Sequence, residues 1–451
     1  MDPGAPLRSR EHRTGRIRLI TSVSLSAALI VGGTLTVAGG GPASAGHQDL
    51  RSDSVRVGAA DPEVISDWND TAVATIMTDE ARSPAEAYVY FAFMHTAMYN
   101  AVVGITREYK LYRWDRHGRK WASPEAAAAS AAFHLLKNYF FSAAAQKRLY
   151  AAYAASLSAV PDGAAERAGV RYGRGAAHRI INLRLDDGRY APVEFTMAPE
   201  PGVWRPTADP PVAFSTPWLA EMTPLVMDDP EQFRPGPPPA LDSAKYAREF
   251  NEVKDLGGAT GSSRKPWQTQ TALFFSDIGV GGLQAALRDL VSRRGFDISE
   301  SARLFAVSEV AAADGFVSCW DAKFHYGFWR PVTAIQLADD DGNPATEPDP
   351  DWASLIPAPP YPDYTSGLNT AVGSISRAVA HVLGTNRINL RITSAAAAET
   401  RHYRYAGQLN RAAINARIWS GLHFRSADVV GNHRAQRVAS YVFRNAFRPA
   451  H

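Results

Sequence analysis

The sequence predicts an all-α protein, a large helical bundle with long proline-rich loops. Apolar residues recur at helical spacing through most of the chain, and runs that alternate between apolar and polar residues are nearly absent. Two proline-rich stretches, 190–239 and 338–364, show no period. We therefore expect these stretches to be long loops that connect helices and carry functional residues.

The helical pattern starts at Val64. Ser83 followed by Pro84 is typical of a helix start, with a capping residue and a proline in the first turn. In chain order, we expect helices at about 64–80, 83–105, 126–157, 163–186, 241–255, 266–292, 299–327, 367–384, 396–420 and 427–446.

The N-terminus differs in composition from the rest of the chain. Five arginines precede an apolar run, and Ala43-Ser44-Ala45 has the small residues of a cleavage site. This arrangement is typical of a secretory signal peptide, with an uncleaved membrane anchor as the alternative. We expect a secreted, extracellular protein without stable membrane association after cleavage. The expected boundaries are a signal peptide at 1–45, a flexible segment at 46–62 and a single helical domain at 63–451.

Charge and cysteine content exclude several classes of function. Without the first 45 residues, the chain has 43 Lys and Arg against 43 Asp and Glu. This balance gives no support to a nucleic-acid partner or an anionic membrane surface. Cys319 is the single cysteine. An internal disulfide and a cysteine-rich zinc site are therefore excluded.

The segment "KFHYGFWRP" contains a pair of cations in aromatic surroundings. Lys323 and Arg330 are seven residues apart, about two helical turns, so a continuous helix would place them on one stripe. Pro331 disfavours helical geometry at Arg330, which we therefore expect at the helix end beside a loop. The aromatic neighbours can exclude water. The alternative is a pair of solvated surface cations.

The segment "YPDYTSGLNTAVG" places a hydroxyl at the start of a helix. Ser366 is predicted to be the N-cap, and the N–H of Gly367 would be one of the free backbone donors there. A helix N-terminus favours negative charge, so this turn suits an oxyanion. The alternative is an ordinary capped helix.

The segment "ARIWSGLHFRSAD" contains a third group of candidate residues. Arg417 and His423 are six residues apart, so a straight helix would point them to different faces. Gly421 can end the helix and let the chain turn. Arg417 would then end one helix while His423 precedes the next. The alternative is that His423 is a core histidine with satisfied hydrogen bonds.

Together the three segments supply donors for one oxyanion. Two arginines, a lysine, a serine hydroxyl and a glycine N–H suit a tetrahedral or trigonal-bipyramidal anion, and one imidazole can bond to its central atom. Phosphate and vanadate meet this description. Zinc does not, because a cluster of His, Cys or carboxylate ligands is missing from the pattern.

In order and spacing, the segments resemble the signature of the vanadium-dependent haloperoxidase and type 2 phosphatidic acid phosphatase superfamily. That signature is Lys-x6-Arg-Pro, then Pro-Ser-Gly-His, then Ser-Arg-x5-His. The stretches "YGFWRPVTAI", "PPYPDY" and "RIWSGLHFRS" resemble bacterial secreted members. The similarity spans most of 64–446. It implies a helical bundle of the vanadium haloperoxidase type, with the anion site within 320–430.

The resemblance also implies roles for the candidate residues. His423 would be the apical vanadium ligand, with vanadate as cofactor and phosphate as the alternative occupant. The implied reaction oxidises a halide with hydrogen peroxide and halogenates a small organic substrate. In the phosphatase alternative, His423 would form a phosphohistidine. A degenerate, non-catalytic oxyanion-binding protein and a homodimer also stay open. The oxygen-holding residues would be Lys323, Arg330, Ser366, Gly367 and Arg417.

The sequence departs from the signature at four positions. Thr365 replaces its Pro, Leu368 its His and Ala416 its Ser, and Ala427 stands where an acidic residue is usual, one position before Asp428. Leu368 cannot donate, accept or relay a proton. A phosphatase would lose the acid that protonates the leaving group, a step worth roughly 10²–10⁴-fold. The haloperoxidase interpretation is therefore preferred. His325, Tyr364 or His402 could substitute for the missing histidine.

Overall fold

The computed structural model describes residues 60–394 and 397–450, so the predicted signal peptide lies outside the described residues. The all-α prediction is confirmed: the described residues belong to one compact unit made of helices and one small hairpin. Whether 63–451 is a single domain stays a prediction. The helices of the first half are α1 (Glu63–Val73), the π-helical η1 (Ala74–Asp79), α2 (Pro84–Thr106), α3 (Pro124–Tyr139), α4 (Ala143–Ser158), α5 (Ala164–Leu183), η2 (Pro217–Ala220), η3 (Pro230–Phe233) and α6 (Ala244–Gly257).

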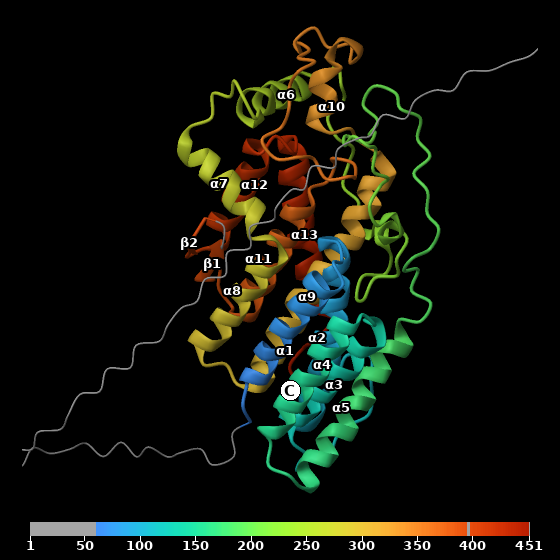
Figure 1. The fold of residues 1–451 in the computed structure, drawn as a ribbon, viewed down its shortest axis with the longest axis vertical. Helices are drawn as coiled ribbons and strands as arrows, with labels where there is room; N and C mark the ends of the chain where they lie inside the picture. The colour runs from blue at the N-terminus through green and yellow to red at the C-terminus, as the bar shows by residue number, and fades with distance from the viewer. Residues whose placement is uncertain (1–59, 395–396, 451) are drawn as a thin grey trace, which may run out of the picture. The chain divides into compact units, whose positions relative to one another are not determined.

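The second half contains most of the candidate site. Its elements are α7 (Pro266–Asp277), α8 (Gly279–Arg294), α9 (Ile298–Tyr326), α10 (Pro331–Gln336), η4 (Ala338–Asp340), α11 (Gly367–Val382), β1 (Leu390–Ser394), β2 (Glu399–Tyr403), α12 (Ala406–Trp419) and α13 (Arg425–Asn445). Figure 1 shows α11, α12 and α13 in one half of the fold and α2 to α5 in the other, with α9 between them.

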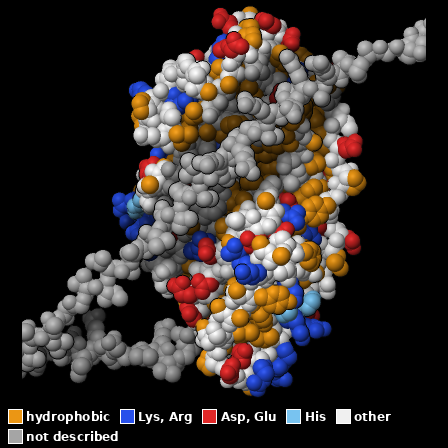
Figure 2. Space-filling model, viewed as in Figure 1, with side chains coloured by type: hydrophobic (Ala, Val, Ile, Leu, Met, Phe, Trp, Pro, Cys, Tyr) orange, Lys and Arg blue, Asp and Glu red, His pale blue; other side chains and the backbone are white. Residues whose placement is uncertain are grey.

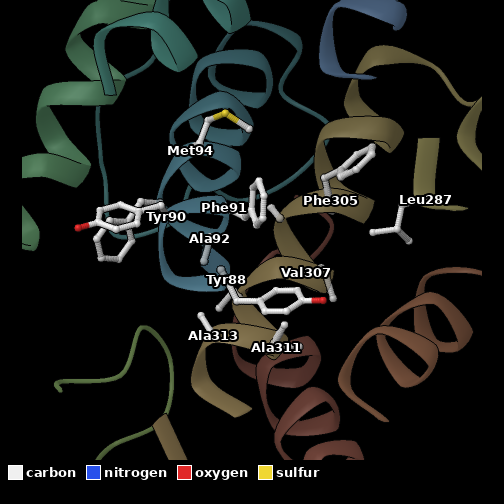
Figure 3. Close-up of a cluster of buried hydrophobic side chains, with 14 of the residues drawn as sticks. Tyr88, Tyr90, Phe91, Ala92, Met94, Leu287, Phe305, Val307, Ala311 and Ala313 are labelled. Carbon is white, nitrogen blue, oxygen red and sulfur yellow. The ribbon is translucent and has the colours of Figure 1, made fainter. Parts of the chain in front are cut away.

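The two halves share a core between α2 and α9, which pack against each other. Nearly every residue of α2 is buried, because this helix is covered on all sides. Ser83 accepts a hydrogen bond from the N–H of Glu86 and Pro84 follows it, as predicted for this helix start. Figure 3 shows Tyr88 and Phe91 of α2 beside side chains of α9 such as Ala311.

Two predicted helices are each divided in the structure. The stretch 126–157 breaks where Phe140 is extended and fully buried, and Ser142 then caps α4 by accepting from the N–H of Ala145. The stretch 266–292 breaks at Gly279, whose φ of +46° lies in the left-handed region that favours glycine. The periodicity predicted one helix in each stretch. Burial of Phe140 ends the first helix, and the positive φ of Gly279 ends the second.

The predicted helix over 396–420 is wrong at its start. Residues 399–403 form β2, which pairs antiparallel with β1, and the helix α12 begins only at Ala406. The Leu390–Ser394 segment alternates between buried and exposed residues, as a half-buried strand does. The short helix α10 is also absent from the sequence-based prediction.

Both predicted proline-rich loops are present. The first loop contains only the short helices η2 and η3, and the buried carboxylate of Asp314 holds it by accepting from the N–H groups of Leu225, Val226 and Met227. The same loop forms a bridge between Val203 and Phe328, next to Arg330. The loop therefore supports the chain at the point where it enters the candidate site.

Charged side chains of both signs are interspersed over the face shown in Figure 2, which agrees with the balanced composition. Among residues 60–394 and 397–450, no helix combines the length and the apolar character needed to cross a membrane.

Candidate active site

The first segment reaches the site through a turn. The helix α9 ends at Tyr326, and Gly327 adopts a φ of +53°, so Lys323 and Arg330 do not project from one helical stripe as a continuous helix would require. Arg330 lies instead at the N-cap of α10, beside the loop, as the position of Pro331 predicts. Both side chains are fully buried. The interpretation as solvated surface cations is therefore excluded.

The second segment is built as predicted. Ser366 is the N-cap of α11, and its hydroxyl oxygen accepts from the backbone N–H of Asn369 at 3.4 Å. Ser366 is fully buried, and Gly367 is also buried in the first turn. The hydroxyl of Ser366 also hydrogen bonds to the carboxylate of Asp428, so an anion bound here would compete with Asp428 for the hydroxyl hydrogen.

The third segment turns at the predicted glycine. Arg417 lies in the last turn of α12, and Gly421 has a φ of +75° between α12 and α13. A side chain here would also collide with the carbonyl oxygen of Gly257, because a Cβ at Gly421 would lie 2.5 Å from it. The turn brings His423 back toward Arg330, whose Nη1 lies 3.3 Å from Nε2 of the imidazole.

Three of the predicted residues, Lys323, Arg330 and Arg417, lie close enough to His423 to act on its charge. The imidazole is 1% exposed, and burial lowers its pKa well below the usual range, with Arg330, Lys323 and Arg417 adding to the effect. His423 is therefore neutral and keeps a lone pair for bonding. Gly367 and Arg417 line one cavity, which joins the second segment to the third.

Asp363, which the sequence reasoning did not select, contacts His423 directly. Its Oδ1 lies 2.7 Å from Nδ1 of the imidazole, and its carboxylate is fully buried. Burial raises the pKa of Asp363, while Arg330 and Lys323 act to lower it. When Asp363 is ionised and the imidazole proton is on Nδ1, His423 donates to Asp363 and the lone pair of Nε2 is free to bond to an anion.

Asp428 follows the position that is usually acidic in the superfamily signature, and its partners are Asn369 and Ser366. Its Oδ1 accepts from Nδ2 of Asn369 at 2.8 Å. Burial raises the pKa of Asp428 to about 7. Asp428 therefore supports the start of α11, and the residue that orients His423 is Asp363. The position of Asp363 within the quoted stretch "PPYPDY" was the available signal.

Tyr361 is a second residue that the sequence reasoning missed. The Nζ of Lys323 lies 4.7 Å from the centre of its ring, and the guanidinium carbon of Arg330 lies 4.9 Å from it. An aromatic face attracts cations most strongly where water is excluded. Tyr361 therefore holds both cations in place while its backbone carbonyl accepts from Nε of Arg330 at 2.8 Å.

The cationic side chains have donors to spare. Within the part of the chain that the structure describes, Nε of Arg417 is buried without a hydrogen-bond partner. Burial lowers the pKa of Lys323 to about 7, and the nearby Arg330 adds to the effect. The buried carboxylates that oppose these cations have raised pKa values. An oxyanion would satisfy the free donors and restore the charge balance, so the residues present fit vanadate or phosphate.

The comparisons with known proteins agree with this fold. The model of the VCPO second helical-bundle domain matches residues 303–451. A bacterial vanadium-dependent iodoperoxidase has a TM-score of 0.75 and 24% identity, with 86% of this chain and 97% of that chain covered. The holo-type bacterial vanadium-dependent chloroperoxidase has a TM-score of 0.66 and 15% identity, with the same shares covered.

A curated relative adds evidence from sequence. The vanadium chloroperoxidase of Curvularia inaequalis is 28% identical over 199 residues, which are 37% of this chain and 32% of that protein. The matched part thus spans about a third of that relative. By fold, this chain is similar to the solved vanadium-dependent haloperoxidases, and residues 303–451 match the model of their second helical-bundle domain.

In this haloperoxidase-like chain, the cavity is lined by the apolar side chain of Leu368 at the position where the superfamily signature has a histidine. Leu368 lines the same cavity as Arg417. None of the proposed substitutes lines it: His325 and His402 are exposed, and the hydroxyl of Tyr364 donates to the carbonyl oxygen of Gly236. None of the described residues that line this cavity is a histidine, so the six candidate residues, here called the cradle, have no histidine acid beside them in it.

Proposed function

We propose that this haloperoxidase-like protein oxidises halide with hydrogen peroxide at a vanadate in the buried cationic site. Lys323, Arg330, Ser366, Gly367 and Arg417 would hold its oxygens, and His423 would bond to vanadium through Nε2. The proposal depends on one observation. Three buried cationic side chains surround the neutral imidazole of His423, and Nε of Arg417 has no hydrogen-bond partner in the described structure. When bound, vanadate would supply a Lewis acid that activates peroxide.

The protein contributes a fixed arrangement of charge. The donors are buried and held by the chain before any ligand arrives: Nη1 of Arg330, for example, donates to the carbonyl oxygen of Leu422 at 2.8 Å. Preorganised donors of this kind stabilise negative charge without the cost of reorganisation. Asp363 fixes the ring of His423, and Tyr361 helps to keep water away from the cations. The N-terminal sequence supports a secreted location for this activity.

The test is vanadate loading followed by peroxide-dependent oxidation of iodide or bromide, measured from acidic to neutral pH. Vanadate-dependent turnover is the expected result. Binding without turnover is the strongest competing function, because Leu368 removes the acid of the signature. Stoichiometric binding of vanadate or phosphate with no oxidation at any pH would support that alternative. Trapping of a phosphohistidine at His423 would support a phosphohydrolase.

Asp363→Asn is expected to lower the affinity for vanadate by about 10–100-fold, the usual range for the outer partner of a ligating histidine. The amide keeps the shape of the carboxylate but can present its NH₂ group to Nδ1. That contact would favour a proton on Nε2 and remove the lone pair. Asp428→Asn is the comparison variant, since this buried carboxylate contacts Asn369 and Ser366 and has no contact with the imidazole among those that the structure gives it. Equal losses in the two variants, measured by titration with vanadate, would contradict the assignment of Asp363.

Leu368→His is expected to raise the rate of halide oxidation at least about tenfold, since a positioned acid or base typically contributes roughly 10²–10⁴-fold. The new imidazole would enter the cavity beside Arg417 and could deliver protons there. Leu368→Phe serves as the control for a change of size without proton transfer. Steady-state rates as a function of pH are the measurement, and equal rates in both variants would argue against a missing proton donor.

A further inference from the structure

We propose that an outer face formed by α5 and the loop between α2 and α3 binds an acidic polysaccharide, a sugar chain with repeated carboxylate or sulfate groups. This face consists of residues 107–120 and 164–182 and is here called the basic face. It contains ten Lys and Arg against three Asp and Glu, whereas the rest of residues 46–451 has 33 against 40. A balanced chain therefore has a local excess of positive charge that includes no residue of the cradle.

A stripe of basic side chains runs along the exposed side of α5, at spacings of four, three and four residues: Arg167, Arg171, Arg174 and His178. These spacings place all four on one side of the helix, along about 16 Å of its length. All four are exposed, and the ion pairs among residues 60–394 and 397–450 include none of them. The stripe is therefore free to meet negative charge from a partner.

A groove of about 760 Å³ lies between α5 and the loop before α3. Cations line it from both sides, since Arg113 and Arg116 belong to the loop and Arg179 to the helix. Asp115 is the one acidic residue among the described residues that line it. Guanidinium groups on two walls suit carboxylate or sulfate groups between them, because each can make forked hydrogen bonds to two oxygens.

Contacts between the loop and α5 hold the groove in shape. Nε of Arg179 donates to the carbonyl oxygen of Arg113 at 2.7 Å, and the hydroxyl of Tyr172 donates to that of Arg116 at 2.6 Å. The ring of Tyr172 also stacks on Trp114, with the ring centres 5.0 Å apart. A surface that is ordered before binding loses less conformational freedom when a ligand arrives.

The charge of the basic face acts on His134 of the neighbouring helix α3. Burial lowers the pKa of His134 to about 4, and three basic neighbours add to the effect: Arg174, His178 and Lys137. Figure 2 shows Lys, Arg and His side chains together near the lower end of the molecule, where Figure 1 places α5. An acidic ligand would offset this repulsion between like charges.

A narrow charged chain fits this face better than the flat surface of a membrane does. A chain that lies in the groove can be contacted from both walls, whereas a bilayer would reach only the rims. Repeated charges along the chain would also meet successive cations of the stripe, so several weak contacts add up to a measurable affinity. Because the cations are exposed, we expect binding to weaken as the salt concentration rises.

The test is binding of polygalacturonate and of heparin, a carboxylated and a sulfated polysaccharide, to the full chain by isothermal titration calorimetry. Arg171→Gln/Arg174→Gln removes two charges from the stripe. The matched control is Arg391→Gln/Arg411→Gln, which removes two exposed arginines from β1 and α12. At low salt, we expect at least one polymer to bind, and the stripe variant to bind it at least about fivefold more weakly than the control. Arg116→Gln, a change in the groove, should also weaken binding by about twofold or more.

Neutral dextran should not bind, and iodide oxidation by the stripe variant should stay within twofold of the control, because no cradle residue is changed. Equal losses of binding in the stripe variant and its control would show that binding follows net charge alone, and would overturn the inference. Absence of binding to both acidic polymers at low salt would overturn it as well. So would binding only to vesicles of phosphatidylserine and phosphatidylcholine.

Discussion

Arg417→Ala is expected to lower the rate of halide oxidation at saturating vanadate by about 10²–10³-fold, the range found for loss of one preorganised oxyanion donor. Arg417 is the cradle arginine with the least support from the protein, because its buried Nε has no partner in the described structure. Its donors are therefore free for a ligand, and alanine would remove them without breaking a hydrogen bond that the protein makes for itself.

The same helix provides a control for this variant. Arg411 lies on α12 and is exposed, so Arg411→Ala removes a positive charge of equal size outside the cavity. The measurement is the rate of peroxide-dependent triiodide formation, together with the melting temperature of each variant. A rate for Arg417→Ala within twofold of the Arg411→Ala rate would contradict a role for Arg417 in the reaction.

His423→Ala is expected to abolish halide oxidation and to weaken vanadate binding by more than the ~10–100-fold typical for loss of an outer partner. Among the six candidate residues, His423 is the one proposed to supply a lone pair to the central atom, since the other five are proposed as donors to its oxygens. His433→Ala is the control, because His433 is exposed on the neighbouring helix α13. Measurable vanadate-dependent oxidation by His423→Ala would show that the nitrogen of His423 is dispensable.

The sequence was most informative where local chemistry decides structure. Ser366 as an N-cap and Gly421 as a helix break depend on a hydroxyl and on a missing Cβ, and both are visible in a single sequence. Pro331 also placed Arg330 correctly beside a loop. The candidate residues could therefore be assigned to one site before their distances were known.

The partners of these residues were harder to predict because they come from distant parts of the chain. Asp363 and His423 are 60 residues apart, and their contact depends on how the loop before α11 meets the turn after α12. Tyr361 holds Lys323 and Arg330 through its ring, and aromatic–cation contacts have no sequence spacing of their own. Asp428 is close to His423 in sequence, but the residue that contacts the imidazole is the distant Asp363.

The errors in secondary structure have a similar origin. Alanines favour a helix, and the Ala395–Ala398 run therefore extended the predicted helix toward the residues that form β2. Residues 399–403 form a strand instead, because they pair with β1, and such contacts often outweigh local preference. The alternation in "LRITS" was the available signal for the hairpin, although five residues are a short pattern.

Titration of the purified protein with vanadate, in the presence and absence of phosphate, tests the oxyanion site most directly. Isothermal titration calorimetry should give one vanadate bound per chain, with phosphate competing for the same site. The predicted competition follows from a cradle of arginine, lysine and backbone donors, which both anions can use. A protein that shows no saturable binding of vanadate, or that binds it with undiminished affinity in saturating phosphate, would contradict the proposed site.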